Sequence, residues 1–174
     1  MIEPLAFRIR PTKLEDIKGQ SHLIGENKIL SKMVENQKLF SIIFYGPPGT
    51  GKTTLASALA NQLNIPYRKF NAVTGNKKDL DSIFLESKLS NGLVVIVDEV
   101  HRLHKDKQDL LLPHIEDGSI IMIGATTSNP LFAINPAIRS RCQLLEVKKL
   151  SDDDLRQAIN RALIIEEGLN NKVS

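Results

Sequence analysis

The sequence has little of what marks secreted or membrane proteins. Its single cysteine, Cys142, excludes a disulfide within the chain and fits a reducing cytosol. No window approaches the roughly 18 consecutive apolar residues of a membrane span. The N-terminus, Met1 to Leu5, lacks the basic stretch and the long apolar run of a secretory signal. We therefore expect a cytoplasmic protein.

Tryptophan is absent, and the histidines are not spaced as metal ligands. His101, His104 and His114 form no zinc pattern with the one cysteine. Repeats and low-complexity segments are also missing. The composition is ordinary, with 41% hydrophobic and 25% charged residues and a net charge of +3. A mildly basic chain is compatible with nucleic acid, but no basic cluster with interleaved aromatics assigns the DNA contacts.

The chain alternates between strand and helix patterns, which predicts an α/β fold with a five-stranded parallel sheet and helices on both faces. The expected strands are residues 41–45, 67–71, 93–97, 120–124 and 143–147. The runs at 93–97 and 120–124 are continuously apolar, as in strands buried on both faces. Helices are expected over 22–38, from the glycine-rich loop to about 64, over 79–89 and over 107–116. Pro113 should kink the last of these or end it early.

The two ends of the chain differ from this alternating core. Residues 1–20 look like an ordered but irregular arm. Ser151 and Asp154 have the spacing of a capping pair at the start of a helix, which should run to about Glu167. Its apolar face calls for partners beyond residue 174. We therefore divide the chain into an arm (1–20), a core (21–150) and the first helix of a further helical subdomain (151–174).

Residues 46–53 read Gly-Pro-Pro-Gly-Thr-Gly-Lys-Thr, a complete phosphate-binding loop between an expected strand and an expected helix. Its glycines let backbone N–H groups converge on phosphate oxygens at the start of the helix. Lys52 can reach the β- and γ-phosphates, and the Thr53 hydroxyl can ligate Mg²⁺. The glycines do not form G-x-G-x-x-G, which excludes a dinucleotide-binding oxidoreductase. The predicted nucleotide-binding residues are Gly46, Pro47, Pro48, Gly49, Thr50, Gly51, Lys52, Thr53 and Thr54.

Asp98 and Glu99 follow the apolar run at 93–97, at the end of a strand expected to lie next to the phosphate loop. Asp98 can hold the Mg²⁺ shell, and Glu99 can orient and deprotonate the attacking water. Taken alone, the pair could be an acidic turn. Coupled to the phosphate loop, it indicates catalysis.

The segment Gly124 to Asn129 follows the strand at 120–124 and should place a polar side chain beside the γ-phosphate. Thr127 is the first candidate for this sensor, followed by Asn129 and Thr126. The alternative is a simple turn into Pro130.

Arg141 precedes the last expected strand and could be an arginine finger that completes the site of a neighbouring subunit. Arg139 competes for this role, and either arginine could be a plain surface charge. His101 and Arg102 could couple Glu99 to a partner strand or to DNA, or be structural. Cys142 enters a strand and should be a small core residue.

Together these motifs resemble those of AAA+ ATPases, in the branch of clamp loaders and Holliday-junction helicases. The narrower likeness is to the replication-associated recombination protein A family, which includes the Werner-helicase-interacting protein. It rests on Asp-Glu-Val-His-Arg at 98–102, Gln-Asp-Leu-Leu-Leu-Pro-His-Ile-Glu-Asp-Gly at 108–118 and Ile-Gly-Ala-Thr-Thr-Ser-Asn-Pro at 123–130, and it extends over about residues 4–150. The chain departs from that pattern at Leu103-His104, Ser128 and Arg139, where the family usually has Phe-Asn, Glu and Leu.

The resemblance implies an AAA+ core whose helical lid begins at residue 151, with a second sensor arginine and a tetramerisation region beyond residue 174. It implies that Ile17 and Gly19 border the adenine. It also implies a DNA-dependent, Mg²⁺-dependent ATPase at stalled or damaged replication forks, associated with the nucleoid. Fork, gap or single-strand–duplex DNA, single-strand-binding protein and further copies of the chain are the implied partners.

Three other functions stay open at this point. A clamp-loader subunit would require a sliding clamp, and a Holliday-junction branch-migration motor would form a ring with a junction-binding partner. A nucleotide-gated scaffold would hydrolyse ATP only incidentally.

Overall fold

Five parallel strands form the central sheet of the computed structural model, which describes Pro4 and residues 10–164. Their order across the sheet is β2-β3-β4-β1-β5. The strands are β1 (Ile42–Tyr45), β2 (Tyr67–Asn71), β3 (Leu93–Asp98), β4 (Ile120–Thr126) and β5 (Gln143–Glu146). This confirms the predicted fold class, and all five predicted strands are present with ends shifted by at most two residues.

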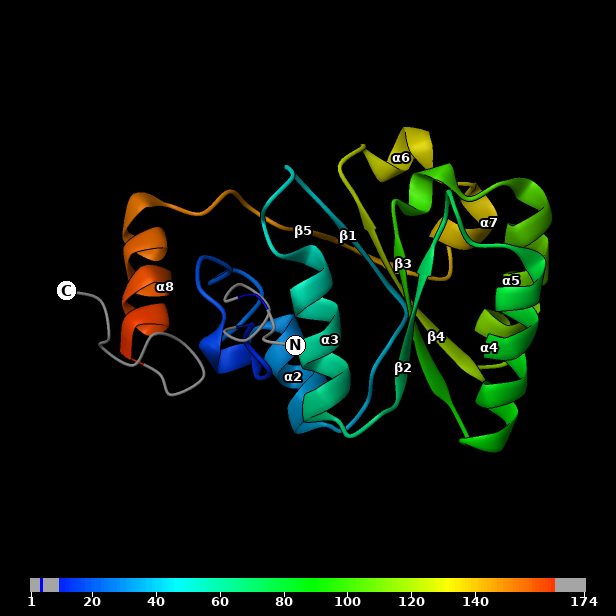
Figure 1. The fold of residues 1–174 in the computed structure, drawn as a ribbon, viewed down its shortest axis with the longest axis horizontal. Helices are drawn as coiled ribbons and strands as arrows, with labels where there is room; N and C mark the ends of the chain where they lie inside the picture. Colours follow the sequence, from blue (N-terminus) through cyan, green and yellow to red (C-terminus); the bar gives the residue numbers. More distant parts are fainter. Residues whose placement is uncertain (1–3, 5–9, 165–174) are drawn as a thin grey trace.

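Helices cover both faces of the sheet (Figure 1). On one face lie α2 (Ile29–Glu35) and α3 (Lys52–Gln62), with the 3-10 turn η1 (Leu14–Asp16) beside them. The other face carries α4 (Lys77–Leu89) and α5 (Lys105–Glu116). The short elements η2 (Val100–Arg102), α6 (Pro130–Ala133) and α7 (Pro136–Arg139) were not predicted. The last described helix is α8 (Asp152–Ile164), so the predicted end near Glu167 lies outside the described residues. Among the described helices, none is both long and apolar enough to cross a membrane.

One prediction of a helix was wrong. The helix expected over 22–38 is only α2, because Gly25 (φ 131°) and Asn27 (φ 62°) adopt left-handed backbone conformations that a helix cannot contain. Of the two effects expected of Pro113, an early end of α5 does not occur, since the helix continues to Glu116. Leu111 and Ile115 are buried on either side of it. Asp109 and Pro113 are exposed, so the carbonyl that loses its helical partner can be solvated.

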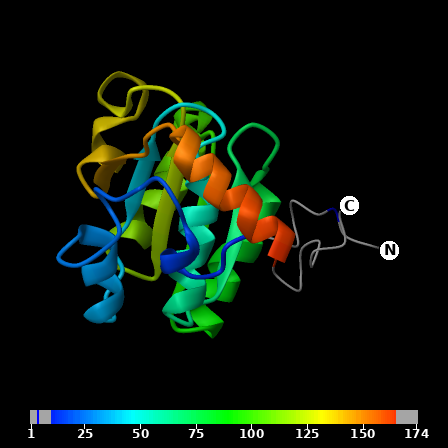
Figure 2. The same ribbon diagram turned by 90° about the vertical axis from the view of Figure 1, so that its left-hand side faces the viewer.

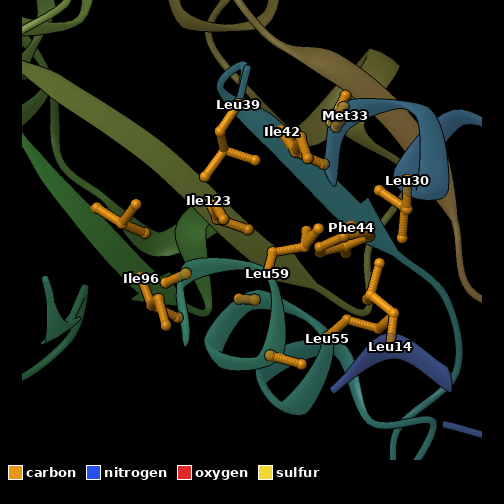
Figure 3. Close-up of a cluster of buried hydrophobic side chains, with 14 of the residues drawn as sticks. Leu14, Leu30, Met33, Leu39, Ile42, Phe44, Leu55, Leu59, Ile96 and Ile123 are labelled. Atoms are coloured by element: carbon orange, nitrogen blue, oxygen red, sulfur yellow. The ribbon is translucent and has the colours of Figure 1, made fainter. Parts of the chain in front are cut away.

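Two apolar clusters hold the layers together. In the cluster between the sheet and α3, Ile42 and Phe44 of β1 are fully buried with Leu55 and Leu59 of α3, and Leu30 of α2 extends it (Figure 3). The second cluster lies between the sheet and α4–α5. Since β1 contributes to both clusters, the strand that leads into the phosphate loop is buried on both faces.

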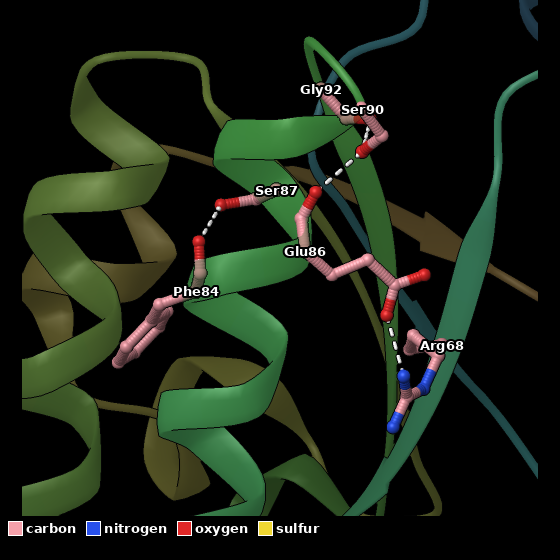
Figure 4. Close-up of polar contacts among 6 residues, drawn as sticks. All are labelled: Arg68, Phe84, Glu86, Ser87, Ser90 and Gly92. Carbon is pink, nitrogen blue, oxygen red and sulfur yellow. Dashed lines mark hydrogen bonds and ion pairs between the residues drawn. The ribbon is translucent and has the colours of Figure 1, made fainter.

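Helix α4 is tied to its neighbours by polar and aromatic contacts. Arg68 of β2 forms an ion pair with Glu86, and Ser90 closes the end of the helix on the Glu86 carbonyl (Figure 4). Phe84 stacks on His114 of α5 with ring centroids 4.1 Å apart. The predicted start at residue 79 was two residues late, because Asn76 and Asp79 form a capping box ahead of it.

Candidate nucleotide-hydrolysis site

The phosphate loop leaves the carboxyl end of β1 and enters α3 at Lys52. Gly46 donates its N–H to the Thr126 carbonyl (3.2 Å), and a Cβ at Gly46 would lie 2.1 Å from the Val147 carbonyl oxygen. The loop is therefore wedged between the ends of β4 and β5, where only glycine fits. Gly49 and Gly51 have φ values of 73° and 84°, which turn the chain towards the start of α3. The free N–H groups at a helix start favour a bound phosphate.

The Lys52 side chain folds back over the phosphate loop and binds its carbonyl groups. Its Nζ donates to the carbonyls of Gly46 (2.9 Å) and Pro47 (2.8 Å) and lies 3.3 Å from Thr50 Oγ1. Burial lowers the pKa of the ammonium group, and the nearby Asp98 carboxylate offsets part of that effect. A phosphate entering the loop would replace two neutral carbonyls with a charged acceptor, which makes stronger hydrogen bonds to lysine.

Asp98 ends β3, but that strand is not the immediate neighbour of β1. The sequence placed Asp98 on a strand next to the loop, whereas β4 lies between β3 and β1. Asp98 is paired in register with Ala125 of β4, and Tyr45 of β1 is paired with Thr126. The carboxyl ends of β1, β4 and β3 thus form one row that carries the loop, the sensor segment and the two carboxylates.

Glu99 has a left-handed backbone (φ 52°, ψ 46°), a conformation that is costly for a residue with a side chain. The turn that it begins is anchored to β4 at two points. Val100 packs over Gly124, and His101 Nδ1 lies 2.8 Å from Thr126 Oγ1. Gly124 and Thr126 share one face of β4 because side chains alternate along a strand. His101 therefore has a structural contact to the sensor strand, which favours the structural alternative for this residue.

The three sensor candidates differ in their surroundings. Thr126 is buried, and its Oγ1 also accepts the Ser128 N–H (3.0 Å). Asn129 caps α6, with its Oδ1 accepting the Leu131 N–H (3.0 Å). Thr127 is exposed at the same edge as the phosphate loop. These contacts favour Thr127 as the residue that would face a γ-phosphate. The cap formed by Asn129 fits the alternative reading of this segment, a simple turn into Pro130.

A cavity of about 240 Å³ opens beside the loop, between the N-terminal segment and α8. Ile17 lines it together with Gly49, Thr50, Gly51 and Thr54. Gly19 lies next to it, since a Cβ there would meet Leu150 Cδ2 at 2.3 Å. The predicted adenine-bordering residues are therefore close to the loop. Sequence reasoning missed the other lining residues, which come from distant segments: Arg10, Pro11, Asp16, Lys18, Leu150, Ala158 and Arg161.

The N-terminal segment is fixed to the end of β5 and the residues after it. The Gln20 side chain is 1% exposed and makes two bonds to Lys148, donating to its carbonyl (2.9 Å) and accepting its N–H (3.0 Å). His22 Nε2 lies 2.6 Å from the Glu146 carbonyl oxygen. These contacts hold the segment that contains Ile17 beside the cavity. No sequence motif predicts them.

Arg141 lies apart from the other predicted site residues. It precedes β5, so it occupies the amino edge of the parallel sheet, and the four residues of β5 span about 13 Å at roughly 3.3 Å each. Arg141 pairs with Glu116 (2.6 Å) and donates to the carbonyl of Ala137 (2.8 Å). Arg139 instead donates to three carbonyls around α6, those of Pro130, Leu131 and Ile134. Arg141 is thus the better candidate for reaching a second subunit, and Arg139 stabilises α6.

Comparisons with known proteins agree with this geometry. The family model for the ATPase family associated with various cellular activities (AAA) matches residues 42–150. The chain is 55% identical over 162 residues to replication-associated recombination protein A of Bacillus subtilis, covering 93% of this chain and 38% of that protein. It is 42% identical over 165 residues to the Escherichia coli protein of the same name, covering 92% and 37%.

A eukaryotic relative and a solved structure extend the likeness. ATPase WRNIP1 of Dictyostelium discoideum is 40% identical over 164 residues, with 92% of this chain and 19% of that protein covered. The Holliday junction branch migration motor RuvB of Thermotoga maritima superposes with a TM-score of 0.73 at 29% identity, covering 90% of this chain and 54% of that one. The chain therefore spans well under half the length of these curated relatives, and the likeness to the recombination protein predicted from its motifs is confirmed.

Proposed function

This chain belongs to the ATPase family associated with various cellular activities, and on that basis we propose that it binds ATP with Mg²⁺ at residues 46–54 and hydrolyses it. The observation that carries the proposal is the row of strand ends in which the phosphate loop, Thr127 and Asp98-Glu99 lie at the carboxyl ends of β1, β4 and β3. Phosphoryl transfer depends mainly on positioning and charge stabilisation, which such a row can supply.

The donor atoms at this edge fit a magnesium ion. The Thr53 hydroxyl and the Asp98 carboxylate are hard oxygen ligands, the type that Mg²⁺ prefers, and Mg²⁺ usually keeps several waters besides. When bound, the ion would neutralise charge on the β- and γ-phosphate oxygens. Lys52 binds the same phosphates, and Glu99 orients and deprotonates the attacking water. Arg141 of a neighbouring copy would complete the charge stabilisation, so a homo-oligomer, a tetramer by the family resemblance, is part of the proposal.

We further propose that hydrolysis is stimulated by DNA and serves the repair and recombination of stalled or damaged replication forks. The names of the bacterial relatives support a role in replication and recombination. DNA with forks, gaps or single-strand–duplex junctions and single-strand-binding protein are the proposed partners, in the cytoplasm at the nucleoid. The chain segment 1–20 acts as an arm bordering the nucleotide, 21–150 as the ATPase core and 151–174 as the first part of a lid.

A branch-migration motor is the second candidate, because the superposed structures are those of RuvB. Their identity to this chain is 29–32%, whereas the Bacillus subtilis recombination protein is 55% identical. The difference favours fork maintenance over junction migration.

Steady-state ATPase measurements on a DNA panel test the proposal with the native protein that contains this chain. The panel holds no DNA, single strand, blunt duplex, gapped or forked duplex and a four-way junction, each with and without a sliding clamp. Lys52→Ala tests whether the turnover comes from the loop at residues 46–54.

Stimulation by gaps, forks or single-strand–duplex ends without a clamp supports fork maintenance. Stimulation only by four-way junctions indicates a motor, and a strict clamp requirement indicates a loader. Turnover without any DNA response would leave a nucleotide-gated scaffold, and turnover unchanged by Lys52→Ala would refute the site itself.

A further inference from the structure

Helix α8 covers the cavity beside the phosphate loop but is held there by few contacts. Its start is close to the N-terminal segment, since a Cβ at Gly19 would lie 3.0 Å from Asp154 Oδ2. None of its described residues is buried. In two views at right angles, α8 lies beyond the N-terminal segment, on the side of the sheet opposite α4 and α5 (Figures 1 and 2). The helix thus forms one wall of the cavity without being packed into the core.

Arg161 is the cationic residue that α8 contributes to this wall. It lines the cavity together with Ala158 of the same helix and with Gly49, Thr50 and Gly51 of the loop. Its Nε is buried and has no hydrogen-bond partner among the described residues. A buried guanidinium donor without an acceptor is costly, so such a group in a native protein calls for an explanation. The cavity that it lines offers one: a ligand that brings acceptor atoms.

The position of the cavity decides which part of the nucleotide Arg161 would meet. On the proposed function, the loop amides and Lys52 bind the phosphates. The ammonium group of Lys52 donates to the carbonyls of Gly46 and Pro47. The cavity is lined by Gly49, Thr50, Gly51 and Thr54 at the end of the loop and by apolar side chains, Pro11, Ile17 and Leu150. Apolar walls suit a flat purine ring, while arginine stacks on aromatic faces and donates hydrogen bonds to ring nitrogens.

We propose that Arg161 binds the adenine ring of the nucleotide and so ties α8 to the ATPase core. This inference rests on the proposed function, because it needs ATP or ADP at residues 46–54. One ligand then contacts the loop through its phosphates and α8 through its base. Nucleotide binding consequently orders α8 over the site, and a residue 15 positions after the last strand determines base affinity.

The test compares Arg161→Ala with Arg156→Ala, an exposed arginine on the same helix that does not line the cavity. ADP binding is measured by calorimetry on the native protein, and inorganic tripolyphosphate serves as a ligand without a base. Arg161→Ala should weaken ADP binding about tenfold or more, as expected for a lost charge-assisted contact. Tripolyphosphate binding should not change, and Arg156→Ala should bind both ligands like the parent protein.

Hydrogen exchange gives an independent measurement. ADP should slow amide exchange along α8 in the parent protein and in Arg156→Ala, but not in Arg161→Ala. Arg161→Lys keeps the charge but loses the planar group, so its ADP affinity should fall between the two; it also replaces the alanine variant if that one does not fold.

Unchanged ADP affinity in Arg161→Ala would overturn the proposal while leaving the ATPase function standing. Equal losses for ADP and tripolyphosphate would also overturn it, since they would indicate a phosphate contact or a general disturbance. If the parent protein and Lys52→Ala both fail to bind ADP, the proposed function falls as well.

Discussion

A single methyl group at Gly124 should disturb the turn that carries Glu99. A Cβ at this position would lie 2.9 Å from Val100 Cγ1, 3.1 Å from its Cβ and 3.2 Å from its Cγ2. Ordinary contacts begin near 3.4 Å, so residue 100 would have to withdraw by about 0.5 Å (3.4 − 2.9). Rotating the valine side chain cannot relieve the conflict, because its Cβ is itself too close. The backbone of the turn must therefore move.

We predict that Gly124→Ala lowers the free energy of unfolding by about 1–3 kcal/mol, the usual effect of an extra carbon in a packed core. Val100 is 3% exposed, so the added volume has no outlet to solvent. Because Glu99 directly precedes Val100, the turnover number for ATP should fall while ADP affinity stays unchanged. Urea unfolding measures the first effect, and ATPase and calorimetric assays measure the second.

Val100→Ala provides the matched second change. Alone it should cost roughly 1–3 kcal/mol through lost burial and a small cavity. In the double variant it removes two of the three close atoms and leaves only the 3.1 Å contact. The double variant should therefore be more stable than the sum of the single effects by about 0.5–3 kcal/mol, the range for contacting residues. Strict additivity, or a Gly124→Ala protein as stable as the parent, would refute the packing argument.

Three further predictions concern the site and the core. Glu99→Gln should bind ATP normally and lose turnover by about 10²-fold or more; near-normal turnover would rule out the general base. Arg141→Ala should bind ATP without hydrolysing it, and Lys52→Ala subunits should restore activity in mixtures; no restoration would count against action in trans. Burial raises the pKa of Cys142 to about 12 from an ordinary 9.0, so its contribution to stability is complete below pH 9 and lost between pH 9 and about 12. Urea unfolding at pH 7 and pH 10 should show a loss of stability roughly 1 kcal/mol larger for the parent than for Cys142→Ala, and equal losses would contradict this prediction.

What the sequence could predict was set by how local each signal is. The phosphate loop and the apolar runs of β3 and β4 are continuous patterns, so the parallel sheet and the position of the candidate residues at the ends of its strands were predictable. Strand order was not, because nothing in the run ending at Asp98 says that β4 lies between it and β1. The helix expected over 22–38 was wrong for a different reason, which lies within the segment itself. Its apolar spacing is helical, but left-handed turns at Gly25 and Asn27 interrupt it.

The cavity beside the loop shows the limit more sharply. Its walls come from the N-terminal segment, the loop and α8, and only tertiary contacts bring them together. Gln20 fixes the first wall through paired hydrogen bonds to Lys148, a separation of 128 residues. Neither that pairing nor the placement of Arg161 can be predicted from a periodic pattern or from a motif of fixed spacing in the sequence. Residue types alone could predict the phosphate loop, but not the walls of the cavity beside it.

The proposed parts of the site differ in how firmly the fold holds them. The loop and the Glu99 turn follow the buried strands β1 and β3, and Val100 of the turn is itself buried, so these parts are in place before any ligand arrives. Arg161 is carried by a helix none of whose described residues is buried, and Arg141 is held at the opposite edge of the sheet by a hydrogen bond to the Ala137 carbonyl and an exposed ion pair with Glu116. A surface ion pair contributes only about 0–1 kcal/mol, so a neighbouring phosphate can readily displace it. On our proposals, binding therefore needs only the rigid core and α8, whereas hydrolysis also needs a second copy of the chain, and regulation can act on that requirement without altering the core.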